Sequence, residues 1–118
     1  MTGTSRPIDT DDLPDVIKRY LEAHTARDAS GATRAMTPQA TVTDEGRTYR
    51  GAPEIEAWLN RATSEYTYTT TLLGAEQAGP DRYTAIQRLE GDFPGGRVDL
   101  RFRFTLDQGL IGDLVIAP

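Results

Sequence analysis

The clearest pattern in the chain is a strict alternation of apolar and polar residues from Val98 to Leu106. The apolar positions are Val98, Leu100, Phe102, Phe104 and Leu106, and the polar positions between them are Asp99, Arg101, Arg103 and Thr105. A period of two with aromatic and branched side chains predicts a strand with one buried face and one solvated face. Such a strand is typical of an antiparallel sheet whose apolar side covers a core or a pocket.

The second half of the chain predicts four strands separated by short turns. The strands are expected at 66–75, 82–90, 98–107 and 110–116, with turns at Gly79-Pro80-Asp81, Phe93-Pro94-Gly95-Gly96 and Asp107-Gln108-Gly109. Because a parallel pair needs a longer crossover, consecutive strands here are expected to pair antiparallel. In the last strand Asp113 has the parity of Ile111, opposite to that of Leu114 and Ile116, and the pattern leaves open which set faces inward.

The first half of the chain predicts three helices and a hairpin. The helices are expected at about 13–27, at 31–36 after a Ser30 cap, and after Gly51 with Trp58 in the apolar stripe, while strands 40–44 and 47–50 form the hairpin. The order of elements is that of an α+β protein. We expect a flexible N-terminal tail over residues 1–11 and a single domain over residues 12–118, with a curved antiparallel sheet of about six strands.

Composition narrows the classes of function. The 118 residues carry a net charge of −5, which disfavours binding to nucleic acid or to anionic membranes. The sequence has no apolar run that could span a bilayer and no secretory signal, and without cysteine it can form neither a disulfide nor a thiolate metal site. We therefore expect a cytoplasmic protein with no nucleic-acid or membrane partner.

Tyr20 and Asp44 are the candidate catalytic pair. Tyr20 lies on the apolar stripe of the first helix, and Asp44 has the parity of Ala40 and Val42, so both side chains are expected to point inward. Burial would raise the pKa of the Asp44 carboxyl toward the range of a general base, and a nearby phenol can donate a hydrogen bond to a substrate oxygen. The alternatives are a core tyrosine and an aspartate that serves only its Asp-Glu-Gly turn.

Further residues are expected to line the inside of the sheet and to contact a ligand. They are Trp58, His24, Gln87, Leu89, Phe93, Leu100 and Phe102. Each also has a structural alternative, such as a helix anchor for Trp58 or a core position for His24. With one histidine and no cysteine we expect no metal site.

Local sequences spread over residues 13–116 resemble those of the nuclear-transport-factor-2-like superfamily, which includes SnoaL-like polyketide cyclases and ketosteroid isomerases. They are Val16-Ile17-Lys18-Arg19-Tyr20, Ala26-Arg27-Asp28-Ala29-Ser30-Gly31, Ala40-Thr41-Val42-Thr43-Asp44, Gly51 followed by Ile55 and Trp58, Gly91-Asp92-Phe93-Pro94-Gly95-Gly96, and Phe102-Arg103-Phe104. The resemblance implies a cone-shaped sheet closed by helices, a pocket inside the cone and a homodimer formed through the sheet.

The resemblance also implies an activity without a cofactor. Tyr20 and Asp44 match the positions of the tyrosine donor and the aspartate base of ketosteroid isomerases, whereas Leu100 stands where those enzymes carry a second donor. We expect a small-molecule pocket protein, an isomerase or cyclase that acts on a small apolar carbonyl compound. The alternative is a non-catalytic ligand-binding or dimeric accessory module of the same fold.

Overall fold

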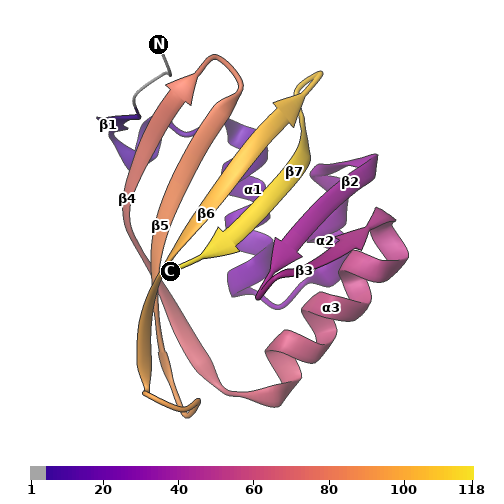
Figure 1. Cartoon of the computed structure of the whole chain (residues 1–118), viewed down its shortest axis with the longest axis vertical. Helices are drawn as coiled ribbons and strands as arrows, with labels where there is room; N and C mark the ends of the chain where they lie inside the picture. The colour runs from indigo at the N-terminus through magenta and orange to yellow at the C-terminus, as the bar shows by residue number, and fades with distance from the viewer. Residues whose placement is uncertain (1–4) are drawn as a thin grey trace.

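Three α helices and one curled seven-stranded sheet make up the computed structural model, which describes residues 5–118 (Figure 1). The helices are α1 (Asp15–Thr25), α2 (Ala29–Arg34) and α3 (Gly51–Glu65), with a short 3-10 helix at Thr10–Asp12. The strands are β1 (Arg6–Ile8), β2 (Met36–Asp44), β3 (Arg47–Arg50), β4 (Tyr68–Gly79), β5 (Arg82–Gly91), β6 (Arg97–Asp107) and β7 (Leu110–Ala117). The predicted α+β class and curved sheet are confirmed.

The order of strands across the sheet is β1-β4-β5-β6-β7-β2-β3. The pairs β4–β5, β5–β6 and β6–β7 are antiparallel, as their short connections predict. The pair β2–β7 is parallel, which differs from the all-antiparallel expectation. The rule for short connections does not apply to this pair, because β3, α3 and β4 to β6 lie between the two strands in the chain.

The N-terminal segment is more ordered than the sequence predicts. Of the tail expected over residues 1–11, residues 1–4 lie outside the described residues, whereas Arg6–Ile8 forms β1 and pairs antiparallel with β4. The edge of β4 supplies hydrogen-bond partners for this backbone, and Ile8 packs against the hydrophobic core. The folded part therefore begins before the predicted boundary at residue 12, and β1 is the strand beyond the expected six.

The second helix begins two residues earlier than its pattern predicts. Asp28, rather than Ser30, is the N-cap of α2, and its carboxylate accepts a hydrogen bond from the backbone N–H of Gly31 at 3.0 Å. Arg27 before it has a φ of 58°, a left-handed conformation that turns the chain between α1 and α2. Aspartate and serine are both good caps, so the sequence alone does not choose between them.

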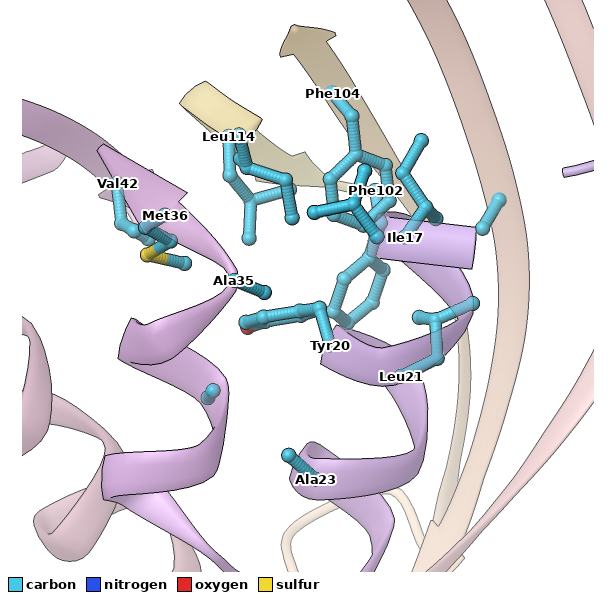
Figure 2. Packing of buried hydrophobic residues seen from close by; sticks show 14 of the residues in the cluster. Ile17, Tyr20, Leu21, Ala23, Ala35, Met36, Val42, Phe102, Phe104 and Leu114 are labelled. Atoms are coloured by element: carbon cyan, nitrogen blue, oxygen red, sulfur yellow. The ribbon is translucent and has the colours of Figure 1, made fainter. Parts of the chain in front are cut away.

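The apolar face of β6 lies inside, as the alternation predicts. Phe102 and Phe104 are each 1% exposed and pack against Ile17 and Tyr20 of α1 (Figure 2). On β7 Leu114 and Ile116 are buried, and so is Ile111 from the other parity set, because the strand register shifts between Ile111 and Asp113. Asp113 lies toward the other face, where its carboxylate accepts a hydrogen bond from the Thr41 hydroxyl at 2.6 Å. The core therefore fills the concave side of the sheet, between β6, β7 and the helices.

The candidate pocket and its buried polar residues

An open cavity of about 1080 Å³ lies between the curled sheet, the β2–β3 hairpin and α3. Five of the nine aromatic side chains of the chain line this cavity: Tyr49, Trp58, Tyr66, Tyr68 and Phe93. Aliphatic side chains from β5, β6 and β7 complete its wall, namely Leu89, Val98, Leu100 and Ile116. The charged side chains Glu45, Arg47, Arg61 and Glu65 line it too, so the cavity combines an aromatic and aliphatic wall with a polar share of similar size. Small-molecule sites are concave and place polar groups among apolar side chains.

Asp44 supplies a carboxylate to the wall of this cavity. It ends β2 with the parity of the buried Ala40 and Val42, so the regular strand aims its side chain inward, as predicted. Its Oδ2 accepts a hydrogen bond from the indole Nε1 of Trp58 at 3.1 Å. Burial raises the pKa of Asp44 above 3.8, and hydrogen bonds from the Trp58 indole and the Glu45 backbone offset part of this rise. The carboxylate thus contacts both its own turn and the cavity.

Tyr20 lies behind the cavity wall rather than on its surface. Its side chain is fully buried, with its ring edge-on to Phe104 at a centroid distance of 5.6 Å and stacked on His24 at 6.2 Å. In Figure 2 its hydroxyl points away from α1, toward the segment that carries Ala35. This hydroxyl has no hydrogen-bond partner among the described residues. Burial raises the pKa of Tyr20, and the charges of Tyr68 and Asp44 raise it further, so the phenol stays protonated.

The other predicted ligand contacts fall into two groups. Trp58, Leu89, Phe93 and Leu100 line the cavity, whereas His24, Gln87 and Phe102 are buried one side chain deeper. The inward parity of Gln87 is confirmed, because Gln87 is 2% exposed. Parity therefore identifies the inner face of a strand correctly but does not separate the cavity wall from the core.

His24 is a neutral side chain within the core. Its ring lies edge-on to Phe102 at 5.7 Å and faces Tyr68 at 6.3 Å. Burial lowers its pKa from 6.5 to about 4, and the positive charge of Arg27 contributes in the same direction. At neutral pH the imidazole can donate and accept hydrogen bonds but carries no charge.

Tyr68 is a cavity residue that the sequence reasoning missed. It is the first residue of β4, it is half-buried, and the Arg27 guanidinium lies over its ring at 5.7 Å. Burial raises the pKa of Tyr68, Arg27 opposes this, and Asp44 adds to the rise. The available signal was the pair Tyr66 and Tyr68, two aromatic residues at a spacing of two where the chain enters the sheet. Tyr68 is thus one of three tyrosines, with Tyr49 and Tyr66, that share the cavity wall with Asp44.

Neither a metal site nor a membrane-spanning helix is found in the part of the chain that the structure describes. Over residues 5–118 no three His, Asp or Glu side chains gather closely enough to hold a metal ion. None of the helices in this range has the length and apolar character needed to cross a membrane.

Comparison with known proteins gives structural relatives only. No protein-family model matches the sequence, and no curated protein sequence matches it. A proposed polyketide cyclase from Sinorhizobium meliloti is 29% identical, with a TM-score of 0.86 over 93% of this chain and 100% of that chain. A nuclear-transport-factor-2-like protein of unknown function from Cytophaga hutchinsonii is 13% identical, with a TM-score of 0.67 over 87% of this chain and 86% of that chain.

A ketosteroid isomerase shares the fold as well. The Δ5-3-ketosteroid isomerase from a Mycobacterium species is 19% identical, with a TM-score of 0.71 over 88% of this chain and 90% of that chain. The predicted cone-like sheet with its helices is thus the fold of these relatives. The chain therefore has the nuclear-transport-factor-2-like fold, and its likeness to the Sinorhizobium protein extends along nearly the whole chain.

Proposed function

We propose that the protein is a cofactor-free enzyme that moves a proton next to the carbonyl group of a small, largely apolar compound. Asp44 is the general base, and Tyr20 donates a hydrogen bond to the substrate oxygen. The observation that carries this proposal is the carboxylate of Asp44 in the wall of an aromatic cavity, where burial raises its pKa. A carboxylate with a raised pKa is a stronger base at neutral pH than an ordinary aspartate.

Each side chain has one role in the proposed step. The Asp44 carboxylate takes the proton from the carbon beside the carbonyl. The electron pair of that C–H bond forms a C=C bond, the π pair of the carbonyl moves to its oxygen, and Asp44 then returns the proton to a carbon of the enolate. The Trp58 indole, bonded to Oδ2, orients the carboxylate. The Tyr20 phenol, whose raised pKa keeps it protonated, stabilises the negative oxygen. The structural likeness to the proposed polyketide cyclase is consistent with this class of reaction.

A proton-exchange assay tests the proposal without knowledge of the natural substrate. The probe is 2-tetralone, an apolar ketone, and the measurement is the exchange of its α-protons in D₂O, followed by NMR. We expect the protein to accelerate the exchange and Asp44→Asn to slow the catalysed rate by roughly a hundredfold. Tyr20→Phe should slow it by about tenfold, because one donor to the oxyanion is lost.

A matched control is the Asp99→Asn variant. Asp99 lies on the opposite face of the sheet, where it forms an ion pair with Arg88 at 2.8 Å. Its loss should leave the exchange rate unchanged. An Asp44→Asn variant as active as the parent protein would contradict the assignment of the base.

The second candidate function is a non-catalytic ligand-binding module. It is favoured by the position of Tyr20, which lies behind the cavity wall, and by Phe102 and Phe104, which fill the inner end of the cone. In that case 2-tetralone would bind, but the exchange of its α-protons would not be accelerated. The same assay, combined with calorimetric binding, therefore separates the two functions.

We also propose that the protein forms a homodimer through the sheet, at β4. Leu72 and Leu73 on β4 are the large hydrophobic side chains that remain exposed within residues 5–118, at 37% and 45%. Exposed leucines beside polar rows are consistent with a surface that a second copy covers. Light scattering at micromolar concentration should give twice the mass of the 13.0 kDa chain, and Leu73→Glu should give the monomer. A stable monomer for the parent protein would contradict this proposal.

A further inference from the structure

Two polar side chains at the inner end of the cone have buried atoms without partners. His24 is 7% exposed and Gln87 is 2% exposed. Neither Nδ1 of His24 nor Nε2 of Gln87 has a hydrogen-bond partner among the described residues. A buried polar atom without a partner destabilises a fold, so these two atoms, which come in addition to the Tyr20 hydroxyl, call for an explanation.

The two side chains flank the same aromatic ring from opposite sides of the core. The His24 imidazole, on α1, lies edge-on to Phe102 at 5.7 Å. Gln87, on β5, stands opposite Leu100 of β6 in the sheet register, so Phe102 is its diagonal neighbour on the inner face. At this spacing long side chains reach each other across a strand pair.

The pair also adjoins the open cavity. Leu100, opposite Gln87, lines that cavity, and so does Leu89, two residues along β5. Tyr68 lines it too, and its ring is 6.3 Å from that of His24. Tyr68 therefore lies between the cavity and His24, and the exposed guanidinium of Arg27 lies over its ring. A ligand that displaces the Tyr68 ring comes beside the His24 imidazole, while Gln87 adjoins the cavity through Leu89 and Leu100.

We propose that His24 and Gln87 form an inner polar subsite that binds a hydroxyl group of the ligand, at the end of the molecule remote from Asp44. The hydroxyl oxygen accepts a hydrogen bond from the Gln87 Nε2, and the same group either donates to the His24 Nδ1 or accepts from it. The inference rests on the proposed small-molecule cavity but does not require that the protein be a catalyst.

The chemistry of the two atoms selects a hydroxyl over the other common groups. A hydroxyl both donates and accepts, so it satisfies the imidazole in either tautomer, whereas a carbonyl satisfies only one of them. A charged ligand group does not suit this subsite, because burying a charge is unfavourable; burial already keeps His24 neutral, with a pKa of about 4. The ligand class is therefore an apolar, flat carbonyl compound with a hydroxyl at its far end.

Binding of two matched ketones tests the subsite independently of any reaction. The probes are 2-tetralone and 6-hydroxy-2-tetralone, and calorimetry measures the affinity of each. In the parent protein 6-hydroxy-2-tetralone should bind about tenfold more tightly than 2-tetralone, because its hydroxyl satisfies the buried polar atoms. In Gln87→Leu and in His24→Leu this preference should fall to about twofold or less, while the affinity for 2-tetralone should change little.

Gln77→Leu is the matched control. Gln77 is a partly buried glutamine on β4, but its Nε2 already donates to the Gly79 carbonyl and the Tyr83 hydroxyl. It does not line the cavity, so its loss should leave the tenfold preference intact. A preference that survives in Gln87→Leu, or that disappears equally in Gln77→Leu, would overturn the inference.

A second measurement uses only the parent protein and so does not depend on the folding of a variant. On addition of 6-hydroxy-2-tetralone the side-chain amide resonances of Gln87 should shift together with the indole resonance of Trp58. A resonance shift at Trp58 without one at Gln87 would place the ligand in the cavity and contradict the proposed inner subsite. If α-proton exchange is catalysed but the two ketones bind equally tightly, the proposed function is supported and the subsite is wrong. If neither ketone binds, the proposed function and the subsite are both wrong.

Discussion

Acidification from pH 7 toward pH 4 should remove a large part of the stability of the fold through His24. This residue is the only histidine in the chain, and it is 7% exposed between Tyr20 and Phe102. Burial, with a smaller contribution from Arg27, lowers its pKa from 6.5 to about 4. The unfolded chain therefore binds a proton at pH values where the folded protein does not.

The direction and the size of the effect follow from this difference. Because the unfolded state binds more protons between pH 6.5 and pH 4, the free energy of unfolding falls as the pH falls through that interval. Each pKa unit corresponds to about 1.4 kcal/mol, so the whole interval corresponds to about 3 kcal/mol. Small domains have a total stability of about 5–15 kcal/mol, so a loss of this size is readily measured.

The assay is urea unfolding of the parent protein and of His24→Leu at several pH values between 7 and 4. Leucine fills a similar volume and does not titrate, so carboxyl groups that titrate in both proteins cancel in the difference. We expect the variant to gain about 3 kcal/mol relative to the parent as the pH falls through the interval. A difference that stays constant from pH 7 to pH 4 would refute the reasoning, because His24 would then gain its proton equally in both states.

Three further predictions concern packing, capping and the cavity carboxylate. Phe102→Ala should lower the free energy of unfolding, measured in urea, by about 3–5 kcal/mol, because removal of a buried aromatic side chain leaves a cavity. A loss below about 1 kcal/mol would contradict the inner position of Phe102. Asp28→Ala should cost about 1 kcal/mol in thermal unfolding, because the Gly31 N–H loses its cap, whereas Asp28→Asn should cost less. Asp44→Asn should leave stability at pH 7 unchanged or raised. The raised pKa of Asp44 means that the parent protein loses stability as the pH rises from 3.8 through that pKa. A clear fall in the free energy of unfolding of Asp44→Asn would show that Asp44 serves mainly to stabilise its turn.

The fold was largely predictable because its signals are local. The alternation from Val98 to Leu106 predicted a strand and the correct inner face, and the late turns predicted antiparallel neighbours. The parallel pair β2–β7 and the strand β1 depend on contacts between distant segments. No local pattern in the sequence specifies them.

The site was predictable only in part, for a geometric reason. Strand parity and the helical stripe correctly placed Asp44, Tyr20 and Gln87 on the inside. Depth along the cone depends on how far the sheet curls, and periodicity carries no information about curl. Asp44 therefore lies in the cavity wall while Tyr20 lies behind it, and Tyr68, whose strand was predicted, was not recognised as a cavity residue.

The most direct test of the central claim is the titration of Asp44 itself, followed through the NMR signal of its carboxyl carbon. The proposed base requires a midpoint above the ordinary value of 3.8, because burial disfavours the charged form. The indole N–H resonance of Trp58, which is bonded to the same carboxylate, should shift with the same midpoint. A midpoint at or below 3.8 would show that Asp44 is an ordinary hydrogen-bonded turn carboxylate, and the proposed catalytic role would be wrong.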